Sequence, residues 1–294
     1  MTPLEALLPR MEGIPEGPEL SALADQLAGG SGRRITEITY AWRDGSPSMA
    51  VQTGDARARI WPERGGLHLI RGPEQIYPYV LYLPEGCRPG GEKRWPVIFF
   101  FHGIGDRGDD LKGVLRRGLP AHLEKGRGLD AIVIAPQCPA DSHWADSEAE
   151  LQKLLRFIPQ MEAAYPIDRD RMYLTGLSMG GRCTWKLALA LPEVFAAAAV
   201  VCGRTENYGA LPSIRTMPLW LFHGVEDETT PFRTVSAVVP RLLESGCREL
   251  HLTVYPYLGH DVWSRTYARA DLYDWLLAQS LSGNRRGEAA PEYL

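Results

Sequence analysis

The sequence has few cysteines, and none of the pairings that would give them a structural role. There are five, and no two are separated by only two residues: Cys87, Cys138, Cys183, Cys202 and Cys247. Because no CxxC pair is present and the count is odd, the pattern indicates neither a zinc site nor a disulfide framework. We therefore expect free thiols in or near a hydrophobic core.

Other absences exclude whole classes of partner. The 32 Lys and Arg residues are outnumbered by 36 Asp and Glu, so the chain lacks the basic excess typical of nucleic-acid binding. No apolar run approaches the roughly 20 residues that cross a membrane. The first residues, "MTPLEALLPRMEGIPEG", carry an acidic group and prolines where an export signal has a basic and then an unbroken apolar stretch. These features predict a cytoplasmic protein with neither nucleic acid nor membrane as partner.

Short apolar runs, by contrast, recur regularly from residue 67 onward. They cover residues 67–70, 77–84, 95–103, 131–137, 171–176, 196–203, 218–224 and 249–256. The central runs lack polar alternation, which is typical of strands buried on both faces, and helical patterns lie between them. One of these helices should begin after Ser147, with Glu150 completing a capping box. The alternation predicts an α/β fold with a mostly parallel sheet of about eight strands and helices on both faces.

Composition divides the chain into three parts. Residues 1–60 combine Gly- and Pro-rich pieces with a helical pattern at 20–28 and a strand pattern at 33–42, and we expect an N-terminal extension packed on the main domain. Residues 61–282 form the main α/β domain. Residues 283–294 are polar and predict a flexible C-terminal tail.

A serine lies among glycines directly after the fifth run, in "GLSMGG". Gly176, Ser178 and Gly180 form a GxSxG motif between a strand and a helix, which is the context of a nucleophile elbow. The glycines let strand and helix approach closely, and the sharp turn exposes the serine hydroxyl. The alternative is a packing turn with an idle serine.

A serine hydroxyl is a poor nucleophile without a base, and seven histidines could supply one. His260 stands in "YLGHDVW", after the last strand and before the last helix, where a loop can carry it to the carboxyl edge of the sheet. We predict His260 as the base. His102 and His223 each precede a glycine at a strand end and are expected to shape loops, whereas His143 is expected to line the site. His68 and His251 lie inside strand patterns and are expected to be structural, and His122 lies in a helical pattern.

The base needs an acidic partner, and "FHGVEDETTP" offers three acidic residues at the end of the seventh run. Such a run is usually a solvated loop. Its position at a strand end, and the chain order Ser, Asp, His, favour Asp227 as the acid, with Glu226 as the alternative.

Acyl transfer also needs two backbone N–H donors for the developing oxyanion. Met179, directly after the serine, should supply one. The Gly-rich loop "FFFHGIGDRGDD" should supply the other from Ile104, with Gly103 and Gly105 as alternatives. A phosphate-binding loop is disfavoured because the spacing is wrong and no Lys-Ser/Thr pair follows.

These motifs, in this order and spacing, resemble the α/β-hydrolase superfamily, in particular its dienelactone-hydrolase-like and phospholipase/carboxylesterase group with predicted peptidases and esterases. The matching pieces run from Tyr79 to Trp263. The resemblance implies an α/β-hydrolase fold and a Ser178–Asp227–His260 triad, with no metal and no organic cofactor. Dienelactone hydrolases themselves have a cysteine nucleophile, so Ser178 argues against that particular activity.

The segment at 203–217 is short, where many lipases insert a helical cap, so we expect a minimal cap and an open site. Trp144, Trp263 and His143 are candidates for its substrate-binding wall, although Trp144 could equally anchor its loop. We expect a serine carboxylesterase that hydrolyses short-chain or aromatic-acid esters, its partner being a small-molecule ester. The alternatives are a serine peptidase of small peptides and a non-catalytic binding protein on the same scaffold. The sequence leaves open whether the protein is a monomer or a dimer.

Overall fold

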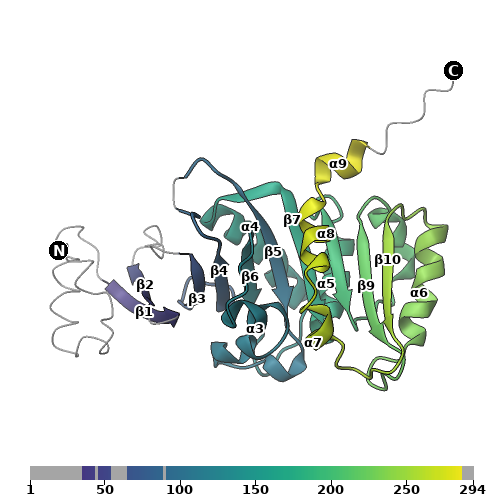
Figure 1. The fold of residues 1–294 in the computed structure, drawn as a ribbon, viewed down its shortest axis with the longest axis horizontal. Coiled ribbons are helices and arrows are strands. Elements are labelled where there is room, and N and C mark those ends of the chain that lie inside the picture. Colours follow the sequence, from purple (N-terminus) through teal and green to yellow (C-terminus); the bar gives the residue numbers. More distant parts are fainter. Residues whose placement is uncertain (1–34, 44–45, 54–64, 89–90, 287–294) are drawn as a thin grey trace.

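The computed structural model describes residues 35–43, 46–53, 65–88 and 91–286 of the chain (Figure 1). The described N-terminal part is a hairpin, in which β1 (Ile35–Arg43) pairs antiparallel with β2 (Ser46–Thr53). The strand predicted at 33–42 is therefore present from residue 35. The helix predicted at 20–28 and the domain boundary at residue 60 lie outside the described residues.

An eight-stranded sheet forms the centre of the main domain. Its strands are β3 (Gly66–Ile70), β4 (Tyr79–Leu83), β5 (Trp95–Phe101), β6 (Ile132–Pro136), β7 (Ile167–Leu177), β8 (Ala197–Val201), β9 (Leu219–Gly224) and β10 (Leu250–Tyr255). Their spatial order is β10-β9-β8-β7-β5-β6-β4-β3. Only the pairs β3–β4 and β4–β6 are antiparallel. The predicted mostly parallel sheet of about eight strands is confirmed.

Helices cover both faces of this sheet (Figure 1). They are α3 (Gly118–Glu124), α4 (Glu148–Ala164), α5 (Met179–Ala190), α6 (Arg233–Glu244), α7 (Trp263–Thr266), α8 (Asp271–Ala278) and α9 (Leu281–Arg286). In β5, Val97 and Phe99 belong to the core shared with α4, α5 and α6, whereas Ile98 and Phe100 belong to the core shared with α3 and α8. The continuous apolar run of this strand follows from burial on both sides.

Two details of the helices depend on single residues. Ser147 caps α4, because its Oγ accepts a hydrogen bond from the backbone N–H of Glu150 at 3.2 Å, as the sequence predicts. The chain after β5 forms a 3-10 helix, η2 (Leu111–Arg116), and then α3 rather than one continuous helix, because Gly118 has a φ of +65° that breaks the helical path.

The C-terminal tail begins later than residue 283. Residues 283–286 belong to α9, and the side chain of Asn284 donates a hydrogen bond to the carbonyl of Ala196 at 2.8 Å. This contact fixes the helix to the start of β8, which corrects the prediction of flexibility for these four residues. Residues 287–294 of the predicted tail lie outside the described part of the chain.

The segment between β8 and β9 holds only a short 3-10 helix, η3 (Tyr208–Ile214), so the cap is minimal. Within the described residues, no helix combines the length and hydropathy needed to cross a membrane. All five cysteines are free thiols, and four of them are buried, which confirms the prediction.

Candidate active site

The turn between β7 and α5 holds Ser178 in a strained backbone conformation. Its φ of 53° and ψ of −114° are unusual for a residue with a side chain. The turn is tight because α5 begins against the end of β5: a Cβ on Gly180 would lie 1.9 Å from the carbonyl oxygen of Phe101. The Ser178 N–H donates to the carbonyl of Val201 at 2.9 Å, which ties the turn to β8. A side chain at position 180 has no room, so only glycine fits there.

Ser178, His260 and Asp227 form one continuous hydrogen-bonded chain. The Oγ of Ser178 lies 2.7 Å from Nε2 of His260, and Nδ1 of the same ring lies 2.7 Å from Oδ2 of Asp227. The side chain of His260 is 20% exposed and that of Asp227 is fully buried. A carboxylate can only accept, so Nδ1 carries the ring proton and Nε2 offers a lone pair to the serine hydroxyl.

Two loops that are distant in the sequence bring the acid and the base together. Gly224 ends β9, and a Cβ there would lie 2.3 Å from the carbonyl oxygens of both Leu258 and Gly259. The N–H of Glu226 donates to the carbonyl of Leu258 at 3.0 Å. The loop after β9 therefore packs directly on the loop that carries His260, and the neighbouring Asp227 faces the imidazole.

Hydrogen-bond donors surround the Asp227 carboxylate. Its Oδ1 accepts from the backbone N–H groups of Thr229 at 2.9 Å and Thr230 at 2.7 Å. The buried His223 donates from Nε2 to the carbonyl of Thr230 at 2.7 Å, and the same nitrogen lies 3.5 Å from Oδ2 of Asp227. Burial lowers the pKa of His223, which keeps its ring neutral. His223 thus shapes the loop that presents Asp227, while Glu226 and Glu228 are exposed.

The loop after β5 lies against the serine turn. A Cβ on Gly103 would lie 3.8 Å from Cβ of Ser178. Ile104 begins the 3-10 helix η1 (Ile104–Asp106), and Met179 begins α5. The first N–H groups of a helix have no acceptor within it, so the N–H groups of both residues lack a partner inside their own helices. The side chain of Ile104 is 51% exposed and lies at the surface of this edge.

His102 holds the loop after β5 in place through two hydrogen bonds. Its Nε2 accepts a hydrogen bond from the N–H of Cys138 at 3.0 Å, so Nδ1 carries the proton and donates to the carbonyl of Gly103 at 2.6 Å. Burial lowers the pKa of His102 to about 4, although the bond to the Gly103 carbonyl opposes this shift; the nearby Arg107 charge adds a smaller lowering effect that is included in this value. The ring is a neutral tie between the loops after β5 and β6.

Trp144 does not form a wall of the site, which corrects one substrate-binding prediction. Its side chain is 1% exposed, and Nε1 donates to the carbonyl of His102 at 3.1 Å. The ring packs edge-on against Tyr77 and Phe101, with centroids 5.5 Å away in each case. The loop after β6 folds its tryptophan into the core, where it anchors the loop.

The other two predicted wall residues are partly accessible. Trp263 begins α7, and its ring meets that of His260 edge-on at a centroid distance of 5.4 Å. His143 is half-buried, with Nη1 of Arg107 lying 3.5 Å from Nδ1 and 3.3 Å from Nε2 of its ring. Trp263 therefore borders the imidazole directly, while His143 is held by the loop after β5.

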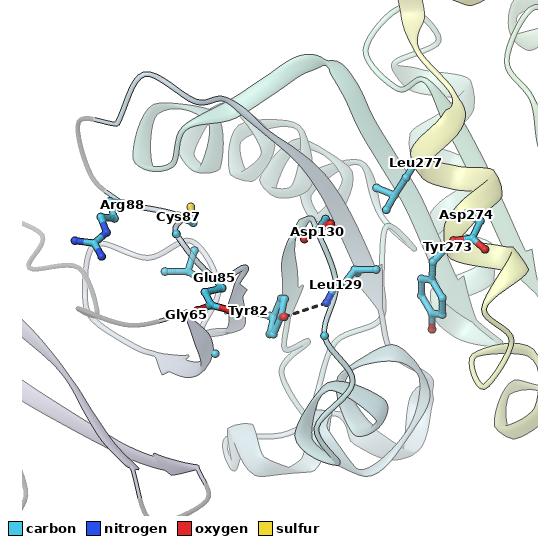
Figure 2. A pocket seen from close by; sticks show the side chains of 14 residues that line it. Gly65, Tyr82, Glu85, Cys87, Arg88, Leu129, Asp130, Tyr273, Asp274 and Leu277 are labelled. Carbon is cyan, nitrogen blue, oxygen red and sulfur yellow. Dashed lines mark hydrogen bonds between the residues drawn. The ribbon is translucent and has the colours of Figure 1, made fainter.

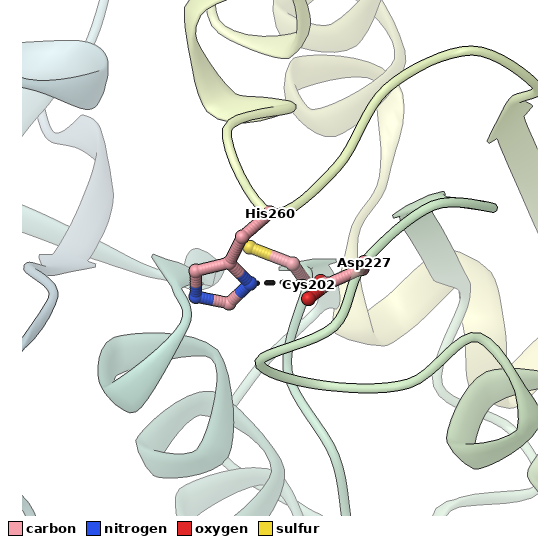
Figure 3. Close-up of side chains that lie close together, drawn as sticks. All are labelled: Cys202, Asp227 and His260. Carbon is pink, nitrogen blue, oxygen red and sulfur yellow. Dashed lines mark hydrogen bonds and ion pairs between the residues drawn. The ribbon is translucent and has the colours of Figure 1, made fainter.

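Sequence reasoning did not single out Cys202. This residue follows β8 with a positive φ of 41°, and its thiol lies with the His260 and Asp227 side chains (Figure 3). The three potential ligand atoms are all within 4.8 Å of one another. Burial raises the pKa of the Cys202 thiol, so it is protonated. The available signal was its position at a strand's carboxyl end, shared with Ser178, Asp227 and His260.

Two pockets have linings that include none of the three hydrogen-bonded residues. One, of about 840 Å³, is lined by Tyr82, Leu129 and Tyr273 among others (Figure 2). It lies at the edge where β6 begins, opposite to the serine turn. The other, of about 440 Å³, borders α5 and includes Arg182 and Arg204. Acidic side chains offset these cations: Asp146 lies 3.5 Å from Arg182, and Glu206 lies 3.3 Å from Arg204.

Known proteins share this architecture. The family model for phospholipase/carboxylesterase matches residues 136–273, which include all three hydrogen-bonded residues. The chain belongs to the α/β-hydrolase superfamily. A poly(3-hydroxyoctanoate) depolymerase of Pseudomonas fluorescens is 28% identical over 62% of this chain and 73% of its own length. A probable feruloyl esterase C of Aspergillus niger is 26% identical over 68% of this chain and 72% of its own length.

The fold is shared with solved structures as well. The crystal structure of a thermostable esterase superimposes with a TM-score of 0.63, at 24% identity, over 84% of this chain and 86% of that chain. This likeness shows the fold, and the family match together with the named relatives makes the protein a carboxylic ester hydrolase.

Proposed function

We propose that this esterase hydrolyses short-chain or aromatic-acid esters through an acyl-enzyme on Ser178, with His260 as the base and Asp227 as the acid. The observation that carries the proposal is the hydrogen-bonded chain from Ser178 Oγ through His260 to Asp227, with 2.7 Å at each step. The nucleophile, the base and the group that orients the base are each within hydrogen-bond reach of the next.

The first half of the reaction follows from the tautomer. His260 Nε2 takes the hydroxyl proton as Ser178 Oγ attacks the ester carbonyl, and the imidazolium that forms is stabilised by the buried Asp227 carboxylate. His260 then gives the proton to the alkoxide, and the alcohol leaves. Water repeats the sequence on the acyl-enzyme, with His260 again taking the proton, and the acid departs from Ser178.

The tetrahedral intermediates carry negative charge on the former carbonyl oxygen. We assign its stabilisation to the backbone N–H groups of Met179 and Ile104, which begin two helices on either side of Ser178. Backbone donors held in place by packing need no reorganisation as the charge develops. His102 supports this arrangement by fixing the carbonyl of Gly103 at 2.6 Å.

The openness of the site supports the proposal that the substrates carry small acyl groups. The segment between β8 and β9, all of it within the described residues, holds only η3 and forms no helical cap. Trp263 supplies an aromatic face beside His260, and we place the acyl group against it, with His143 across the mouth. A flat aromatic acid or a short chain fits a wall of this kind. The feruloyl esterase relative is consistent with the aromatic alternative.

A substrate panel tests the proposal: p-nitrophenyl esters of increasing acyl length, methyl ferulate and aminoacyl anilides, each with the wild-type chain and Ser178→Ala. We expect the esters to be hydrolysed, short and feruloyl acyl groups preferred, and Ser178→Ala to be inactive. Preferential cleavage of the anilides would favour a peptidase. Full activity in Ser178→Ala would overturn the nucleophile assignment, and an inactive wild type would favour a binding protein.

A further inference from the structure

Three side chains of different chemistry lie close together at the proposed triad, and two of them are members of it. Cys202, Asp227 and His260 come from the loops after β8, β9 and β10, and their sulfur, oxygen and nitrogen atoms all lie within 4.8 Å of one another (Figure 3). Among the residues that the structure describes, this is the one group of three such side chains close enough to share a metal ion. The catalytic scheme uses two of them and leaves the thiol without a role.

We propose that Cys202, Asp227 and His260 form an inhibitory site for Zn²⁺. Sulfur, imidazole nitrogen and carboxylate oxygen are the ligand types that zinc takes in proteins, and three protein ligands plus water is a common arrangement. Mg²⁺ and Ca²⁺, which prefer oxygen ligands, are not suited to a site with a thiol and an imidazole.

The backbone holds the cysteine in place for this role. The N–H of Cys202 donates to the carbonyl of Phe222 at 2.8 Å, and its φ of 41° turns the side chain toward the triad. The next residue, Gly203, packs on the serine helix, where a Cβ would lie 2.5 Å from the backbone of Gly181. The sulfur therefore belongs to a fixed turn, whereas His260 lies on a loop and is partly exposed.

The movement required between His260 and Asp227 is small. Zinc bonds of about 2.0 Å to nitrogen and oxygen at tetrahedral angles separate those two atoms by about 3.3 Å. His260 Nδ1 and Asp227 Oδ2 are now 2.7 Å apart. The imidazole must move back by roughly half an ångström to admit the ion between them. An ion reaches the site from the His260 side, since the other two side chains are buried.

Binding would inhibit because it changes the tautomer of the base. The ion forms bonds to Cys202 Sγ, Asp227 Oδ2 and His260 Nδ1 and loses water ligands in exchange. The Cys202 S–H bond breaks, and its proton goes to solvent. The proton of His260 Nδ1 moves to Nε2, because a neutral imidazole bound to metal through one nitrogen carries its proton on the other. Nε2 then has no lone pair to accept the Ser178 proton.

The inhibitory consequence rests on the proposed function of His260, but the site itself does not. Metal binding can therefore be followed apart from catalysis, in the full-length chain carrying Ser178→Ala. Co²⁺ substitutes for zinc and gives a near-ultraviolet charge-transfer absorption when a thiolate binds it. We expect this absorption in Ser178→Ala, its loss in Ser178→Ala with Cys202→Ser, and its persistence in Ser178→Ala with Cys247→Ser. Cys247 is the matched control, being the most accessible of the free thiols.

The activity arm uses p-nitrophenyl acetate with ZnCl₂, MgCl₂ or CaCl₂. We expect zinc alone to inhibit, EDTA to restore the rate, and Cys202→Ser to raise the half-inhibiting zinc concentration at least about tenfold, or about 1.4 kcal/mol. Cys247→Ser should leave it unchanged. Cys202→Ala provides a second variant if the serine form does not fold, as judged by circular dichroism.

The outcomes separate the two proposals. An absent Co²⁺–thiolate absorption, or equal zinc inhibition of wild type and Cys202→Ser, overturns the metal site, whatever the role of Ser178. Activity retained in Ser178→Ala alongside a Cys202-dependent absorption overturns the proposed nucleophile and leaves the metal site standing.

Discussion

His102 and His260 lie at the same edge of the sheet, each after a strand, and each uses both ring nitrogens. His102 bonds two backbone groups, the carbonyl of Gly103 and the N–H of Cys138. His260 bonds two side chains that can exchange charge or protons, Asp227 and Ser178. His102 is fully enclosed, whereas 20% of the His260 side chain is exposed.

The difference shows that the partners of a histidine, more than its position, decide what it can do. Burial keeps His102 neutral, with a pKa of about 4, and its two backbone partners cannot take up or release a proton. His260 faces a carboxylate that stabilises its protonated form and a hydroxyl that can supply the proton. The first ring is suited to holding a loop, and the second to acid–base chemistry.

The largest expected effect is a fall in kcat on replacing His260, which distinguishes its acid–base role from the loop-holding role of His102. His260→Ala removes the base, and we expect kcat to fall by about 10⁴-fold or more, as for other serine hydrolases that lose a triad member. Because His260 lies on a partly exposed loop, the melting temperature should change little. Steady-state kinetics with p-nitrophenyl acetate and a thermal melt measure both. A fall of less than about tenfold would contradict the assignment of the base.

Replacing Asp227 should lower kcat nearly as much as replacing His260. Asp227→Asn can donate its amide N–H to His260 Nδ1 and so stabilise the wrong tautomer, and we expect kcat to fall by about 10⁴-fold. Glu226→Gln is the matched control, because Glu226 is the exposed neighbour in the same loop. Its kcat should stay within about twofold of wild type. The reverse result, with Glu226→Gln inactive and Asp227→Asn active, would exchange the two roles.

Replacing His102 should change the pH dependence of the free energy of unfolding rather than the catalytic rate. Its folded pKa of about 4 lies below the ordinary value of 6.5, so between these pH values the unfolded chain binds a proton that the folded chain excludes. The free energy of unfolding should therefore fall as pH drops from about 6.5 to 4, by up to about 3 kcal/mol from this residue. His102→Gln should remove that part of the slope.

Urea titrations of wild type and His102→Gln across pH 4.5 to 7 measure this term as a difference between the two proteins. Other titrating groups are shared and cancel. If the difference in unfolding free energy is independent of pH, His102 is not kept neutral by burial.

The smallest expected effect concerns two tryptophans. Trp144→Phe loses the hydrogen bond to the His102 carbonyl, and we expect about 1 kcal/mol less stability with KM nearly unchanged. Trp263→Ala should instead raise KM for methyl ferulate more than for p-nitrophenyl acetate. A KM increase in Trp144→Phe at unchanged melting temperature would instead support Trp144 as a substrate-binding residue.

Much of the sheet could be predicted because its strands are buried on both faces. Runs such as that of β5 have no polar alternation, and the alternating helices leave a mostly parallel sheet as the consistent arrangement. The same rule places the ends of β7, β9 and β10 at one edge, which is why Ser178, Asp227 and His260 could be named as candidates from the GxSxG motif, their positions at strand ends and their order in the chain.

Other features depend on tertiary contacts that have no local pattern. Trp144 and Trp263 both follow the end of a strand in the sequence, which does not distinguish a buried tryptophan from an accessible one. Trp144 is buried because it packs against Tyr77 and Phe101. The break at Gly118 depends on a positive φ. Cys202 lies beside His260 because of a turn that a residue with a side chain seldom adopts, so the sequence alone gave little reason to place its thiol there.

We propose Ser178 as the nucleophile that His260 activates. The most direct measurement is labelling of the full chain with a fluorophosphonate, followed by mass spectrometry of the digested protein. We expect one adduct, on Ser178, absent in Ser178→Ala and formed far more slowly in His260→Ala. Labelling at another residue, or undiminished labelling of Ser178→Ala, would contradict the assignment of Ser178 as the nucleophile.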